Sequence, residues 1–98
     1  DIRSYDNRAI DKFLSDNNIL NDIKDLLLNL EDWDEDSIDR VLKAYQIDNN
    51  LSVPKVNQPI RIALTGSTKS PSLGLTLSIV GKNLSIKRIE ELINFIRD

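Results

Sequence analysis

Apolar side chains recur along the first half of the chain at intervals of three and four residues. Residues spaced in this way lie on one face of a helix, so the pattern predicts three helices before residue 50. The polar cluster at 15–18 lies between the first two helices and predicts a turn. The apolar positions of the three helices are Ile10, Phe13 and Leu14; Leu20, Ile23, Leu27 and Leu30; and Ile38, Val41, Leu42 and Tyr45.

An acidic stretch at residues 31–36 precedes the third helix. Asp34 is the predicted N-cap, and the two acidic residues that follow it lie in the first turn, where they stabilise the positive end of the helix dipole. A calcium loop needs a glycine and a fixed alternation of oxygen ligands, and this stretch has no glycine. The sequence therefore favours a helix start over a metal site, with Trp33 packed into the core beside it.

The segment 55–66 supports two interpretations. Its apolar residues alternate from Ile60 to Leu64 as in a strand, whereas Pro59 in a first turn and Gly66 just past the last turn are typical of a helix. The positions of proline and glycine favour the helix, although the strand pattern stays open from the sequence alone.

Two further helices are predicted near the C-terminus. Ser70 and Pro71 indicate an N-cap and a first turn, and Gly81 indicates the residue after the last turn, although Gly74 weakens this helix and residues 73–79 also alternate. The predicted fold class is therefore all-α, a compact bundle of about six helices. The apolar stripe of the final helix is Leu84, Ile89, Leu92, Ile93 and Ile96.

The residue types that are absent narrow the possible functions. The 98 residues are enough for one domain and include no cysteine, histidine or methionine. Thiolate nucleophiles, disulfides, imidazole bases and Cys/His zinc sites are excluded, and binding is favoured over catalysis. Without a methionine, Asp1 is expected to be an internal residue of a longer protein. The lack of a signal peptide and of an apolar run of about 20 residues predicts a cytoplasmic chain that does not enter a membrane.

Charge is distributed unevenly along the chain. Residues 1–48 contain thirteen acidic and six basic side chains, a net charge of −7, whereas residues 49–98 contain three acidic and seven basic side chains, a net charge of +4. This asymmetry points to an anionic partner for the second half, although short stretches of one sign also arise on solvated surfaces. The sequence pI of about 4.9 predicts that any contact with nucleic acid is local.

Three short segments in the second half share the order and spacing of a known family. They are Gln58-Pro59-Ile60-Arg61-Ile62-Ala63-Leu64-Thr65-Gly66, Ser70-Pro71-Ser72-Leu73, and Gly81-Lys82 followed by Arg88-Ile89. In these residues the chain resembles the C-terminal end of bacterial glutamyl-tRNA synthetases, which are class I aminoacyl-tRNA synthetases. Gly74 departs from the family, which usually has a better helix former at that position.

The resemblance implies an all-helical anticodon-binding domain, sometimes described as a helical cage, over residues 1–98. Within it we expect a first helical subdomain at 1–50 and a C-terminal subdomain at 51–98 that carries the anticodon contacts. The implied parent enzyme joins glutamate to its tRNA with ATP and Mg²⁺ in a separate Rossmann-fold domain. This chain alone is expected to bind no cofactor or metal, to catalyse nothing, and to bind the anticodon loop of tRNA as a monomer.

The resemblance also implies which residues contact RNA. In the family, the arginine corresponding to Arg61 lies at a pocket for anticodon bases, the turn corresponding to Ser70, Pro71 and Leu73 lines that pocket, and Lys43 matches a position that is often basic. Anticodon bases are unstacked in their loop, and a guanidinium offers forked donors to base oxygens. Without the family, Arg61 also fits a surface phosphate contact or a solvated side chain, and Ser70 and Pro71 fit a plain helix start. The candidates for phosphate contacts are Lys69, Lys82, Lys87 and Arg88.

A small helical DNA-binding or protein-interaction module is the alternative. The last two helices and the glycine between them have the order of a helix-turn-helix, with Lys87 and Arg88 near the start of the second helix. Glu90 and Glu91 on that helix disfavour contact with DNA. We therefore expect tRNA, and not DNA, as the partner.

Overall fold

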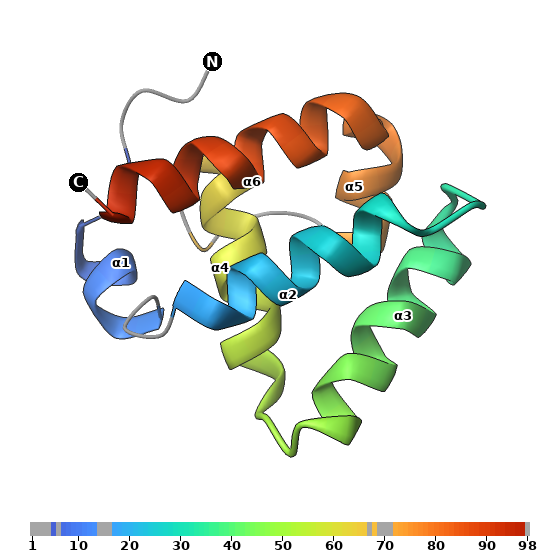
Figure 1. Cartoon of the computed structure of the whole chain (residues 1–98), viewed down its shortest axis with the longest axis horizontal. Coiled ribbons are helices and arrows are strands. Elements are labelled where there is room, and N and C mark those ends of the chain that lie inside the picture. The colour runs from blue at the N-terminus through green and yellow to red at the C-terminus, as the bar shows by residue number, and fades with distance from the viewer. Residues whose placement is uncertain (1–4, 6, 14–16, 67, 69–71, 98) are drawn as a thin grey trace.

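All six elements that the structure describes are helices. The computed structural model describes residues 5, 7–13, 17–66, 68 and 72–97 and contains no strand among them (Figure 1). The all-α prediction is confirmed, and the two segments with strand-like alternation are both helical. The helices are α1 (Asn7–Phe13), α2 (Asn17–Leu28), α3 (Glu35–Asp48), α4 (Val53–Thr65), α5 (Leu73–Val80) and α6 (Lys82–Arg97).

Helix α4 lies at the centre of the fold and contacts each of the other five helices. Its buried residues are distributed around most of the helix circumference, because neighbours pack against it from several sides. This explains the strand-like alternation from Ile60 to Leu64, since a helix covered on several sides buries successive alternate positions. The buried residues of α4 are Val56, Pro59, Ile60, Ile62, Ala63 and Leu64.

Pro59 lies in the interior of α4, so its predicted place in the first turn is wrong. The helix begins earlier, at Val53, and Pro54 occupies the first turn, where an N–H group would have no partner within the helix. At Pro59 one hydrogen bond of the helix is lost. The burial of the Pro59 ring in the core stabilises the helix despite this loss. Gly66 ends α4 in the left-handed conformation, with φ of 85°, as predicted.

The start of α3 agrees with the prediction. Asp34 is the N-cap, and its carboxylate accepts a hydrogen bond from the backbone N–H of Ser37 at 2.8 Å. This backbone hydrogen bond lowers the pKa of the exposed Asp34 carboxyl. Trp33 is half-buried against the core, and its Nε1 donates to the backbone carbonyl of Leu77 at 2.9 Å. The entrance to α3 is therefore held against the last turns of α5.

Helix α5 agrees with the prediction at its end but not at its start. It begins at Leu73 with Ser72 as the N-cap residue. Ser70 and Pro71, the predicted cap and first turn, lie outside the described residues. Gly81 separates α5 from α6 with φ of 92°, as expected for the residue that ends a helix.

Helix α6 buries a slightly different stripe from the predicted one. Leu84 is 40% exposed, so its assignment to the core is wrong, and Ile86 is buried instead. Ile86, Ile89 and Ile93 follow one another at three and four residues and face the core together, whereas Leu84 is out of this register. Of the rest of the predicted stripe, Ile89, Leu92 and Ile93 are buried, and Ile96 is half-buried against the core.

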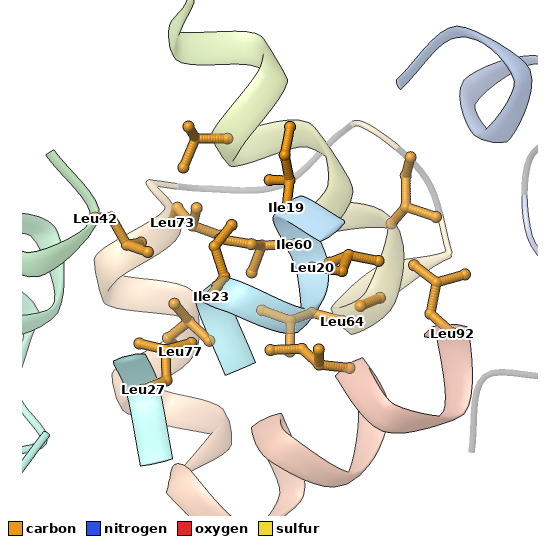
Figure 2. Packing of buried hydrophobic residues seen from close by; sticks show 14 of the residues in the cluster. Ile19, Leu20, Ile23, Leu27, Leu42, Ile60, Leu64, Leu73, Leu77 and Leu92 are labelled. Atoms are coloured by element: carbon orange, nitrogen blue, oxygen red, sulfur yellow. The ribbon is translucent and has the colours of Figure 1, made fainter. Parts of the chain in front are cut away.

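The core forms where α2 packs along α6 and α3 packs on α5, with α4 in contact with all of them. Figure 2 shows side chains of α2, α3, α4, α5 and α6 converging in this core. The labelled residues are Ile19, Leu20, Ile23 and Leu27 of α2, Leu42 of α3, Ile60 and Leu64 of α4, Leu73 and Leu77 of α5, and Leu92 of α6.

Gly74 allows α3 and α5 to approach each other closely. The glycine is buried, and a Cβ atom added to it would lie 2.6 Å from Cγ of Asp39 and overlap that carboxylate. The absence of a side chain at position 74 therefore leaves room for the Asp39 carboxylate beside α5.

Removing the Asp39 side chain should reveal the helix propensity of position 74. In an Asp39→Ala background, Gly74→Ala should raise the free energy of unfolding by about 1 kcal/mol, the difference between alanine and glycine inside a helix. With Asp39 present, the gain should be smaller or become a loss, because the added methyl group displaces the carboxylate. Urea denaturation of the four proteins measures both effects. If Gly74→Ala changes the free energy of unfolding equally with and without the Asp39 side chain, the close contact between position 74 and Asp39 is contradicted.

Acid should weaken the start of α3 through Asp34. Folding lowers the pKa of this carboxyl from its usual value of 3.8, so the ionised side chain contributes to stability above that pH, and the contribution is lost as the pH falls through the lower folded-state pKa. Asp34→Asn keeps a capping acceptor that does not titrate. The stability advantage of the wild type over this variant should therefore shrink between about pH 5 and about pH 2 in thermal denaturation followed by circular dichroism. If the stabilities of the wild type and Asp34→Asn change in parallel with pH, the ionised Asp34 carboxylate does not stabilise the start of α3.

Candidate functional site

A polar stripe runs along one face of α4. Every fourth residue from the start of the helix lies on this face, which gives Val53, Asn57, Arg61 and Thr65. Asn57 and Arg61 are half-buried and Thr65 is exposed, and the Thr65 hydroxyl donates to the backbone carbonyl of Arg61 at 2.8 Å. The stripe thus presents polar side chains on a helix that is otherwise largely buried.

A pocket of about 200 Å³ lies where this stripe meets α3 and the start of α5. In Figure 2, Leu42 of α3 and Leu73 of α5 lie next to each other at this place. The pocket therefore has an apolar wall and polar groups around it. Its lining residues are Asp39, Leu42, Lys43 and Gln46 of α3, Val53 and Asn57 of α4, and Leu73 of α5.

Two of the residues that the sequence singles out for base binding line this pocket, and a third, Arg61, is not among the lining residues. Lys43 is exposed and Leu73 is 4% exposed, and both line the pocket. Arg61 lies on the same face of α4 as Asn57, one turn further along and about 6 Å along the helix axis. Ser70 and Lys69, like Pro71, lie outside the described residues. Helix packing therefore brings Lys43 of α3 and Leu73 of α5 together at the pocket, with Arg61 one turn along α4 from its lining residue Asn57.

The polar groups of the pocket differ in their hydrogen-bonding capacity. The ammonium of Lys43 only donates, the ionised carboxylate of Asp39 only accepts, and the amides of Gln46 and Asn57 do both. A flat heterocyclic ring can pack against the aliphatic side chains while its polar edge meets these groups.

Asp39, Gln46 and Asn57 are pocket residues that the sequence analysis does not identify. Helical spacing contains a signal for two of them, because Asp39 lies four residues before Lys43 and Asn57 lies four residues before Arg61. That signal is useful only once α3 and α4 are known to line one pocket, which is a property of their packing.

The candidate phosphate contacts have different surroundings. Arg88 is half-buried, and its Nη1 donates to the backbone carbonyl of Leu64 at 3.0 Å, near the end of α4. Nζ of Lys82 donates to the backbone carbonyl of Leu30 at 2.8 Å. Lys87 is exposed. Positive charge near the last carbonyls of a helix is favourable, so Arg88 contributes to the stability of the fold.

The described residues contain no metal-binding cluster and no membrane-spanning helix. No group of three or more acidic side chains in that part of the chain is arranged to hold a metal ion. None of the described helices has the length and apolar character needed to cross a membrane. The acidic stretch at 31–36 leads into the N-cap of α3.

Most of the chain matches known proteins. The family described as "Anticodon binding domain" matches residues 2–93. A glutamate–tRNA ligase of Legionella pneumophila is 41% identical over 68 residues, which cover 69% of this chain and 14% of the ligase. The corresponding enzyme of Myxococcus xanthus is 39% identical over 89 residues, covering 89% of this chain and 19% of the ligase. Glutamate–tRNA ligase 2 of Coxiella burnetii is 34% identical over 98 residues, covering 98% of this chain and 21% of the ligase.

The same fold occurs in a solved structure. This is the crystal structure of a glutamate tRNA ligase from Elizabethkingia meningosepticum in complex with its amino acid, with a TM-score of 0.87, 23% identity, and coverage of 95% of this chain and 19% of that chain. The likeness shows the shared fold. The chain spans about a fifth or less of the proteins that it matches.

Two neighbouring basic residues of α6 should differ in their effect on stability. Arg88→Ala should lower the free energy of unfolding by about 1–3 kcal/mol, because it removes a half-buried charged donor to the carbonyl of Leu64. Lys87→Ala should change it by less than about 0.5 kcal/mol, because Lys87 is exposed. Urea denaturation of both variants compares the two. Similar losses would show that the contact between α6 and α4 is not specific to Arg88.

Proposed function

The chain belongs to the anticodon-binding domain family, and from this premise we propose that it recognises the anticodon loop of a glutamate-accepting tRNA as part of a glutamate–tRNA ligase. The three named relatives are glutamate–tRNA ligases. Because the chain spans about a fifth or less of their length, the joining of glutamate to tRNA with ATP and Mg²⁺ belongs, in this proposal, to other parts of the parent enzyme.

The pocket between α3, α4 and α5 is the observation that carries the proposal. Leu73 and Leu42 offer an aliphatic surface to the face of an unstacked base, and Lys43 offers a donor to its edge. Arg61 lies one turn along α4 from the pocket residue Asn57, within reach of the same base or its neighbour. Its guanidinium donates in a planar fork that matches base carbonyl oxygens.

Phosphate contacts are proposed around this pocket. We expect them to come from residues 51–98, where the net charge is positive, together with Lys43 of α3. Lys87 is exposed, whereas Lys82 and Arg88 already donate to backbone carbonyls, so Lys87 is expected to contribute more than either. Lys69 is a further candidate, and Ser70 and Pro71 are proposed to border the pocket ahead of Leu73.

The helix-turn-helix alternative has less support. Its recognition helix would be α6, but one side of α6 is buried in the core through Ile86, Ile89 and Leu92. Glu90 is exposed on the remaining surface, where it would repel the phosphates of a duplex. The family match also favours the interpretation as an anticodon-binding domain.

Substitution of Arg61 distinguishes a contact to an anticodon base from a contact to phosphate. If Arg61 donates to a base edge, Arg61→Ala should weaken binding of a stem-loop with a glutamate anticodon by about 1–3 kcal/mol, the range for bidentate contacts to DNA bases. The loss should be much smaller for a loop in which the contacted base is replaced. Arg61→Lys should not restore binding, because an ammonium lacks the planar fork. Fluorescence anisotropy with the 98-residue chain supplies the affinities for a double-mutant cycle at each anticodon base.

Arg40→Ala is the matched control for this cycle. Arg40 is exposed and lies on another face of α3, beside Ser37 and Ala44, so its loss removes the same charge away from the pocket. Arg40→Ala should weaken the binding of all the stem-loops slightly and equally. Coupling energies near zero at all three anticodon bases would make Arg61 a phosphate contact. Equal or tighter binding of duplex DNA of the same charge would contradict the proposed function itself.

A further inference from the structure

The last turn of α4 is joined to α6 by a charged side chain that lies outside the pocket. Nη1 of Arg88 donates to the backbone carbonyl of Leu64 at 3.0 Å, and Nε of the same guanidinium is buried without a hydrogen-bond partner among the described residues. Arg88 is half-buried, and its neighbours Ser85 and Ile89 on α6 are fully buried. The guanidinium is therefore committed to the contact between α6 and α4.

The hydrogen bonds at the end of α4 are of two kinds. The Thr65 hydroxyl donates to the carbonyl of Arg61 at 2.8 Å, which is a bond within α4. The bond from Arg88 to Leu64 comes from another helix, so it fixes the last turn of α4 relative to α6. The last carbonyls of a helix have no partner within it, and a positive charge beside them stabilises the negative end of the helix dipole. Arg88 supplies both the donor and the charge.

Arg61 is carried by the turn that Arg88 holds. It lies three residues before Leu64, about 5 Å along the helix axis. The place of the Arg61 side chain therefore depends on where the backbone of this turn lies. A planar fork that meets a base edge must be held to within about 0.5 Å of its productive position, so the backbone beneath it has to be fixed.

We propose that Arg88 is a positioning residue for anticodon binding, which acts through Arg61 and does not itself contact RNA. The proposal rests on the proposed function, in which Arg61 donates to an anticodon base. It replaces the expectation from the sequence that Arg88 contacts phosphate. With the carbonyl of Leu64 held by Arg88, the end of α4 is already ordered before RNA arrives, and binding does not have to supply the free energy for ordering it.

Salt dependence distinguishes positioning from a phosphate contact. Arg88→Met keeps the aliphatic packing of the side chain and removes its donors. In titrations of the 98-residue chain with a glutamate anticodon stem-loop, this variant should weaken binding about fivefold or more. The slope of log affinity against log salt should stay that of the wild type. A slope reduced by about 0.7, the value for one contact to a single-strand phosphate, would overturn the proposal.

A double-mutant cycle tests whether Arg88 acts through Arg61. In an Arg61→Ala background, Arg88→Met should change the affinity by about twofold or less, because the side chain that Arg88 positions is gone. In a Lys43→Ala background Arg88→Met should keep its full effect, because Lys43 is carried by α3. The affinities are measured at a temperature where circular dichroism shows each variant to be folded. An equal loss with and without Arg61, or an unchanged affinity in Arg88→Met, would overturn the proposal.

Arg88→Lys provides the test if Arg88→Met does not fold. An ammonium donates to a single carbonyl and keeps the positive charge at the end of α4, so Arg88→Lys should bind within about twofold of the wild type. Arg61→Lys should not bind in this way, because a base edge requires the planar fork. A folded Arg88→Lys that loses about fivefold or more in affinity would overturn the role of the bond to Leu64.

Failure of this proposal differs from failure of the proposed function. If the wild-type chain binds a glutamate anticodon no better than a scrambled one, the proposed function and the role of Arg88 are both contradicted. If Arg61→Ala removes the discrimination between anticodons and Arg88→Met leaves the affinity unchanged, the proposed function stands and only the role of Arg88 is overturned.

Discussion

The burial of α4 by the five other helices is the constraint on which the rest of the structure depends. Beyond its exposed first turn, this helix leaves Asn57, Gln58, Arg61 and Thr65 at least partly exposed, and all but Gln58 lie on one face. The same burial lets the helix continue through Pro59, because core packing outweighs one missing hydrogen bond. The place of Arg61 on the surface therefore follows from the packing of the core.

The pocket arises from how two further helices meet this open face. α3 supplies Lys43 and Asp39, and α5 begins at Leu73, so their positions relative to Arg61 are set by helix packing. The hydrogen bond from Trp33 to the carbonyl of Leu77 ties the entrance of α3 to α5. Side chains carried on packed helices are held more firmly than side chains on loops, which suits a site that must distinguish one base edge from another.

Local chemistry allowed the helix ends to be predicted from the sequence. Asp34 as an N-cap, and Gly66 and Gly81 as helix ends, depend only on residues nearby, and all three are confirmed. The start of α4 could not be located in the same way, because Pro54 and Pro59 both fit a first turn and the core decides between them.

Contacts between distant helices explain what the sequence did not reveal. Gly74 looks unfavourable within α5 alone, and its reason lies on α3, in the carboxylate of Asp39. In the same way, the family resemblance supplied Lys43 and Leu73 separately, but only the packing of α3, α4 and α5 shows that they line one pocket with Asn57 and Asp39.

We propose that RNA binds where α3, α4 and α5 meet. Chemical-shift mapping of the isotope-labelled chain during titration with a glutamate anticodon stem-loop tests this most directly. We expect the largest amide shifts on α4 near Asn57 and Arg61, at Lys43, and at the start of α5, with small shifts along α2. Shifts concentrated in residues 7–30, with the pocket unaffected, would contradict it.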